Sequence, residues 1–195
     1  MKKVLFLLLI TLFILGGCSN DNPKQLSSDE IDGLGFEEQI ESIVDNTNLV
    51  EDYQIVVEGN SVAIVYPTEK VPDSKIVLDK SKESFPNVAM ILVEHLSVLD
   101  IDELVITSYE PSDTDITGLT RVSALFKEET IKDLDFDEWR EDKSDYQQKF
   151  YRNTDAYLIR DNLWEKQDDE IKDKINGSSK SDDSQFWDYY GSYVE

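Results

Sequence analysis

The chain has 195 residues, and its 19 lysines and arginines face 42 aspartates and glutamates, which gives a formal charge of −23. A length of this order favours one compact domain with appendages, and 39% hydrophobic residues are enough to form a core. A chain this negative repels phosphate backbones, so we exclude nucleic acid as a partner.

The N-terminal stretch has the layout of an export signal. A basic start, Met1-Lys2-Lys3, is followed by the apolar run 4–15 and then by Gly16-Gly17-Cys18. A membrane-spanning helix needs about 20 apolar residues, so this run is too short to span a bilayer. Its length and flanks are those of a secretory signal peptide.

The end of this signal resembles a known processing motif. Leu15-Gly16-Gly17-Cys18 resembles the lipobox of bacterial lipoprotein precursors. The resemblance implies that the chain is cut between Gly17 and Cys18, that residues 1–17 are a discarded signal peptide, and that the Cys18 sulfur carries a diacylglyceryl group. It therefore implies a lipid anchor on the extracytoplasmic face of the cell membrane, because two or more acyl chains hold a protein stably on a bilayer.

The cysteine count and the following segment agree with that interpretation. Cys18 is the only cysteine, so the exported chain forms no internal disulfide. Loss of Lys2 and Lys3 leaves 17 basic against 42 acidic residues, a formal charge of −25. Residues 18–35 are polar and are predicted to form a lipidated flexible tether with a reach of about 20–25 Å.

Hydrophobic periodicity predicts the elements that follow. One apolar helical face indicates a helix over 36–47. The β-branched runs 53–57 and 62–66 are predicted strands, and Glu58-Gly59-Asn60-Ser61 between them is typical of a hairpin. A wide apolar stripe predicts a buried helix over 84–99. Further strands are predicted over 104–109 and 119–126, whereas Ile76-Val77-Leu78 fits a short strand or the approach to a helix, and the choice stays open.

This order predicts an α+β fold. The sequence α-β-β-α-β-β is typical of a two-layer sandwich, with about four antiparallel strands and the helices on one face. C-terminal helices are expected to complete a single domain over 36–175.

The last third of the chain is rich in aromatic residues. Several of them fall on one seven-residue series, which predicts a mainly aromatic seam along one face of one helix or two. The series is Phe136, Phe150, Tyr157, Trp164 and Ile171, with Lys143 as its only break, and Trp139 lies three residues after Phe136. Residues 176–195 are predicted to be a linker and an aromatic tail. The tail either packs back on the domain or binds a partner.

Catalytic motifs are missing from the sequence. His95 is the only histidine and lies on the apolar stripe of the helix over 84–99, so we interpret it as a core residue. The sequence has neither a Gly-x-Ser-x-Gly motif nor a Gly-rich phosphate loop. We therefore expect no enzyme activity and no cofactor.

Two acidic stretches resemble the start of a calcium loop. Asp113, Asp115 and Thr117 have the spacing of the first ligands of an EF-hand, and Gly118 follows, but Ala124 stands where a bidentate Glu is required. The stretch Asp133-Leu134-Asp135-Phe136-Asp137 alternates similarly, but Glu138 replaces the glycine. We therefore favour a solvated loop and an acidic helix start, and Ca²⁺ is not expected to bind.

Two hypotheses for function follow. The first is a membrane-anchored, surface-exposed lipoprotein whose acidic, non-catalytic domain binds another protein of the cell envelope. The alternative is a binding module for a small solute or a cell-wall glycan, because Trp and Tyr rings offer flat stacking surfaces with a polar tip. The rings proposed for that contact are Trp139, Tyr157, Trp164 and Trp187.

Overall fold

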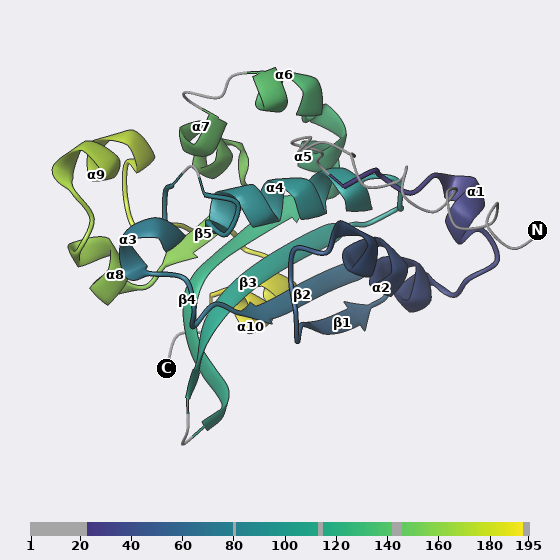
Figure 1. The fold of residues 1–195 in the computed structure, drawn as a ribbon, viewed down its shortest axis with the longest axis horizontal. Coiled ribbons are helices and arrows are strands. Elements are labelled where there is room, and N and C mark those ends of the chain that lie inside the picture. Colours follow the sequence, from purple (N-terminus) through teal and green to yellow (C-terminus); the bar gives the residue numbers. More distant parts are fainter. Residues whose placement is uncertain (1–22, 80, 113–114, 142–145, 193–195) are drawn as a thin grey trace, which may run out of the picture.

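The computed structural model describes residues 23–79, 81–112, 115–141 and 146–192. Over these residues the chain forms one sheet with helices on both faces (Figure 1). The strands are β1 (Gln54–Glu58), β2 (Ser61–Pro67), β3 (Glu103–Ser112), β4 (Asp115–Lys127), β5 (Ala156–Ile159) and β6 (Ser179–Lys180). The helices are α1 (Ser28–Ile31), α2 (Phe36–Thr47), α3 (Asp73–Ile76), α4 (Phe85–Leu96), α5 (Glu128–Asp133), α6 (Phe136–Glu141), α7 (Tyr146–Asn153), α8 (Asp161–Glu165), α9 (Asp169–Ile175) and α10 (Gln185–Tyr190).

The two main helices form where the periodicity predicted them. Helix α2 buries Ile40, Ile43 and Val44, and the Glu38 carboxylate accepts a hydrogen bond from the Gly35 N–H at 2.9 Å, which satisfies a free donor at the start of the helix. Helix α4 is buried on almost every side, including at His95. The segment 76–78, for which the sequence left the choice between strand and helix approach, is the end of α3 and the bend after it.

The sheet has the order β1-β2-β3-β4-β5-β6, and its pairing corrects one expectation. The α+β class is confirmed, but the prediction of four antiparallel strands is wrong, and so is the prediction of helices on one face, because α10 covers the face opposite α4. Strands β2 and β3 are parallel, with Ile64 opposite Ile106, and the other neighbouring pairs are antiparallel. The chain leaves the end of β2 and crosses one face of the sheet through α3 and α4. It then returns to the edge where β2 begins and starts β3 there, as a βαβ connection requires.

The aromatic seam is not one helical face. Helix α7 ends at Asn153, and the chain then turns into β5, which places Tyr157 on a strand. The Asp155 carboxylate fixes this turn, because it accepts hydrogen bonds from the Lys127 N–H at 2.7 Å and from the Thr130 hydroxyl at 3.0 Å. The rings still share one core, because a helix and a strand can both point side chains toward the same face of the sheet.

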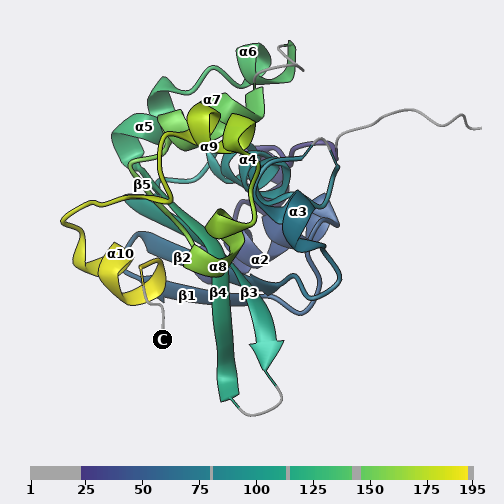
Figure 2. The same cartoon turned by 90° about the vertical axis from the view of Figure 1, so that its left-hand side faces the viewer.

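Two cores lie on opposite faces of the sheet. The larger one packs α2, α4 and α7 against alternate strand residues such as Ile64 and Ile106. The smaller one packs Phe186 and Trp187 of α10 against the intervening residues, such as Ala63 and Val105. Figure 2 shows α10 on the side of the sheet opposite α4.

Residues 23–35, which the composition assigned to the flexible tether, lie against the body. The Asn46 amide donates to the Lys24 carbonyl at 2.7 Å, and the Gln25 amide donates to the Glu94 carbonyl at 2.7 Å. Ile31 at the end of α1 is buried. Within the described part of the chain, no helix has the length and apolarity that crossing a membrane requires.

Candidate functional site: an acidic cleft

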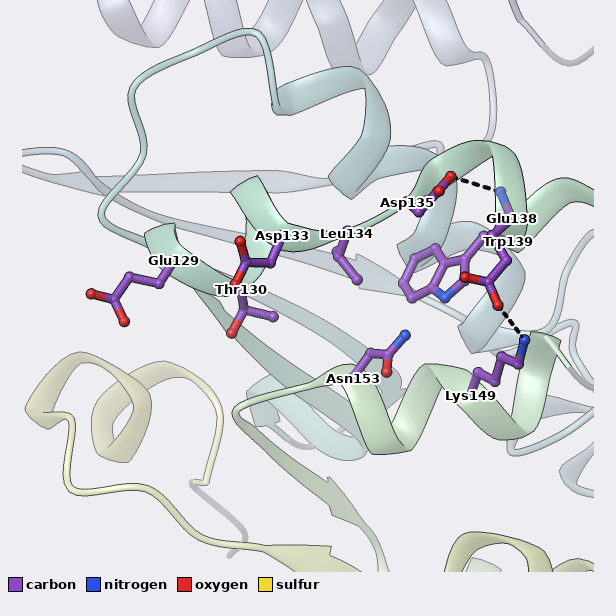
Figure 3. A pocket seen from close by; sticks show the side chains of 9 residues that line it. All are labelled: Glu129, Thr130, Asp133, Leu134, Asp135, Glu138, Trp139, Lys149 and Asn153. Carbon is purple, nitrogen blue, oxygen red and sulfur yellow. Dashed lines mark hydrogen bonds and ion pairs between the residues drawn. The ribbon is translucent and has the colours of Figure 1, made fainter.

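A cleft of about 610 Å³ lies between the α5–α6 segment and α7. Figure 3 shows Glu129, Thr130 and Asp133 on one side, Trp139 on the other, and Asn153 and Lys149 of α7 across from them. Among the side chains that the structure describes, the lining is Glu129, Thr130, Asp133, Leu134, Asp135, Glu138, Trp139, Lys149 and Asn153.

Carboxylates dominate this lining. Four of the nine residues are acidic, and Lys149 is the one base among them. Its ammonium group is paired with the Glu138 carboxylate at 2.9 Å (Figure 3). A second hollow of about 470 Å³ shares Asp133, Leu134 and Asp135 with the cleft and adds Glu94 and Asp137. The negative surface therefore continues past the α5–α6 connection.

Local capping explains why the acidic residues gather here. The Asp135 carboxylate accepts a hydrogen bond from the Glu138 N–H at 2.8 Å, and the Asp135 carbonyl accepts one from the Trp139 N–H at 3.0 Å. A carboxylate at this position satisfies a free donor and complements the helix dipole. Asp135 therefore starts α6 directly after α5, and the two short helices present their acidic side chains to the same hollow.

Trp139 forms the apolar end of the cleft. Its side chain is 3% exposed, and its ring packs edge-on against Phe136 at 6.1 Å and at a tilt against Phe150 at 6.4 Å. The indole nitrogen is buried and has no hydrogen-bond partner among the residues that the structure describes. Buried donors in native proteins are nearly always paired, so within the described part of the chain this N–H is an unused donor in the wall of the cleft.

The small free energy of a single exposed ion pair indicates which kind of ligand the acidic cleft would bind. An exposed ion pair contributes about 0.2–1 kcal/mol, so one ammonium group would be held weakly here. Several positive charges on one segment would meet several carboxylates together. Among the described residues, no group of histidine, cysteine or acidic side chains is arranged to hold a metal ion.

The four aromatic residues proposed from the sequence do not form one surface. Trp139, Tyr157 and Trp187 are 3%, 4% and 2% exposed, so their ring faces are covered in this conformation. Trp164 of α8 is half-buried against the larger core, whereas Trp187 belongs to the smaller core across the sheet. The Tyr157 hydroxyl donates to the Gly177 carbonyl at 3.2 Å and to the Ile175 carbonyl at 3.4 Å.

Other predicted site residues lie outside what the structure describes. Gly17, Cys18 and Asp113 are outside the described residues, as are the side chains of Asp115 and Thr117. Lipidation and cleavage at Cys18 therefore remain predictions. The second acidic stretch is described, and it forms the end of α5, the cap of α6 and its first turn.

Sequence reasoning missed the residues that complete the cleft. Glu129 lies on α5 one turn before Asp133, whereas Lys149 and Asn153 come from α7, and only the packing of α7 brings these two opposite Asp133. The run of acidic residues at 128–138 could have indicated an acidic surface, because it holds more carboxylates than helix capping requires.

Comparisons of the chain with protein-family models, with curated protein sequences and with solved structures found no match.

Proposed function

We propose that this protein is a lipid-anchored, extracytoplasmic protein of the cell envelope, and that its acidic body is a non-catalytic module that binds a basic segment of another protein. The observation that carries the proposal is Leu15-Gly16-Gly17-Cys18 after a basic and apolar start. A diacylglyceryl group on Cys18 would hold the body at the membrane surface.

The acidic cleft supports the second half of the proposal. Glu129 and Asp133 are exposed at its rim, and the adjoining hollow extends the negative surface. Complementary charge speeds encounter and rejects acidic partners. A segment with several lysines or arginines fits this surface better than a single amine, because each exposed pair contributes so little.

A pair of matched variants tests whether binding depends on this surface. Glu129→Gln with Asp133→Asn removes two charges from the cleft, and it leaves the Asp135 cap and the Glu138–Lys149 pair in place. Glu41→Gln with Asp188→Asn removes two exposed charges from α2 and α10. Both variants have the same net charge, so they differ only in where the charge is lost.

The measurement is a titration of each purified protein with a lysine-rich peptide and with a glutamate-rich control, followed through tryptophan fluorescence. We expect wild type and the α2/α10 variant to bind the lysine-rich peptide alike, the cleft variant to bind severalfold more weakly, and added salt to weaken binding. Equal binding by all three proteins would reject the cleft as the site. Capture from solubilised membranes with the same variants then identifies the natural partner.

A further inference from the structure

The docked N-terminal segment leaves very little chain between Cys18 and the body. Hydrogen bonds from Asn46 and Gln25 fix residues 24 and 25 against α2 and α4, and Leu26 packs on the larger core. Only residues 19–22 separate Cys18 from the described chain. Five Cα-to-Cα steps from Cys18 to Pro23 extend to about 16–18 Å at most.

The attachment point lies on the outside of the helical layer. Residues 23–25 run beside α4, on the side of the sheet away from α10, as the two views agree (Figures 1 and 2). Both contacts of this segment are to α2 and to the C-terminal half of α4. The tether therefore leaves the body from the surface of the helices.

The thickness of the body then restricts its orientation. A layer of helices, the sheet and α10 lie one above another between the outer surface of α2 and that of α10. Since a helix with its side chains is about 10–12 Å across and a sheet adds about 10 Å, these outer surfaces are about 30 Å apart. With α10 against the bilayer, residue 23 would stand farther from the membrane than its tether reaches.

We infer that the protein turns the outer surface of α2 toward the bilayer, and that α10 faces away from it. This inference rests on the lipid anchor proposed for Cys18. The membrane-facing surface is acidic, because Glu37, Glu38, Glu41 and Asp45 of α2 are all exposed. Anionic lipids repel such a surface within a screening length of about 8 Å at physiological salt. The body therefore lies close to the membrane without inserting into it.

Single-cysteine labels in the full-length lipidated protein test this orientation. Lipidation occupies Cys18, the only natural cysteine, so one added thiol takes a fluorophore cleanly. Glu41→Cys places the label on the exposed side of α2, and Tyr189→Cys places it on α10, at a residue that is 78% exposed. Both proteins are reconstituted in phosphatidylcholine vesicles that carry a headgroup-attached quencher.

We expect severalfold stronger quenching of the Glu41→Cys label than of the Tyr189→Cys label. Insertion of a long Gly/Ser segment between Asn22 and Pro23 should remove most of that difference, because the body is then free to turn. Equal quenching with the natural tether, or stronger quenching on α10, would overturn the orientation while leaving the anchor intact. Failure of the unlabelled wild-type protein to float with vesicles would overturn the anchor and the orientation together.

Discussion

The face of the sheet under α2, α4 and α7 carries a large buried core, whereas the face under α10 carries a much smaller hydrophobic cluster. Phe150 on the first face touches Phe85 and Phe126 with ring centroids 5.7 Å apart in each case. On the second face, Phe186 and Trp187 of α10 form one cluster with the strand residues Ala63, Val105, Leu125 and Ala156.

Polar contacts also differ between the two faces. The hydroxyls of Thr107 and Ser123 are buried under α10 and donate to the carbonyls of Tyr190 and Gly191, the first at 2.9 Å. The second face is thus sealed by one short helix, which is held by two rings and a few hydrogen bonds. Loss of the first core should unfold the domain, and loss of the second should release α10 alone.

The largest expected effect is that of Phe150→Ala. Removal of a fully buried ring leaves a cavity that its neighbours fill only in part, so we expect the free energy of unfolding to fall by about 3–5 kcal/mol. Urea denaturation followed by circular dichroism measures this change. A loss that matched a surface substitution would show that the first face is not the main core.

Gly191→Ala should act on the second face. A Cβ at this position would lie 2.0 Å from Cε3 of the Trp187 ring, so α10 must shift or detach. We expect a loss of about 1–3 kcal/mol, as for other overpacking changes. Hydrogen exchange should rise in α10 and stay slow in α4, whereas a uniform rise throughout the domain would contradict the independence of the two faces.

Acid should weaken a link at the edge of the first face. Arg121 is 3% exposed and pairs with Asp73, whose other oxygen accepts from Lys166 at 2.7 Å. The hydrogen bond from Lys166 lowers the pKa of Asp73, and the bond from Arg121 adds to this, although partial burial opposes both.

Because its pKa is lowered in the folded state, Asp73 stabilises the fold above its ordinary pKa near 3.8, and that contribution disappears as the pH falls through the folded value. Asp73→Asn should therefore reduce the difference in stability between pH 7 and acid, by about 1 kcal/mol or less because Asp73 is 37% exposed. Asp183→Asn, at a fully exposed carboxylate, is the control. Equal pH profiles for wild type and Asp73→Asn would show that the contacts of Asp73 with Arg121 and Lys166 do not contribute to the pH dependence of stability.

The smallest expected effect is that of Tyr190→Phe. It removes the hydrogen bond from the Tyr190 hydroxyl to Glu58, 2.7 Å long and exposed, which ties α10 to β1. We expect a loss of about 0.5 kcal/mol, visible as slightly faster exchange in α10. A loss as large as that from Gly191→Ala would show that this bond, rather than ring packing, holds the helix.

The sequence predicted the elements whose signal is local and missed those that depend on the path of the chain. Helices α2 and α4 and strands β1 to β4 were predicted because their apolar periodicity is local. The parallel pairing of β2 and β3 was missed, because it depends on the path of the chain through α4 and not on the composition of either strand. Strand β5 was missed because it is only four residues long and Tyr157 fits the helical series.

The cleft was only partly predictable. Asp133, Asp135 and Trp139 stood out as an acidic stretch and an aromatic residue, but their connection with Lys149 and Asn153 depends on α7 folding back beside α5. The docking of α10 on the second face was equally unpredictable from the sequence. The Thr107 and Ser123 hydroxyls that hold it are buried, and their acceptors lie more than 60 positions away in the chain.

The most direct test of the account is the mass of the mature N-terminal peptide from protein purified out of membranes. We expect a peptide that begins at Cys18 and carries a diacylglyceryl group, and we expect Cys18→Ala to abolish both the modification and membrane retention. A mature chain that begins elsewhere, or a Cys18 that carries no lipid, would contradict the anchor and with it the proposed orientation at the membrane.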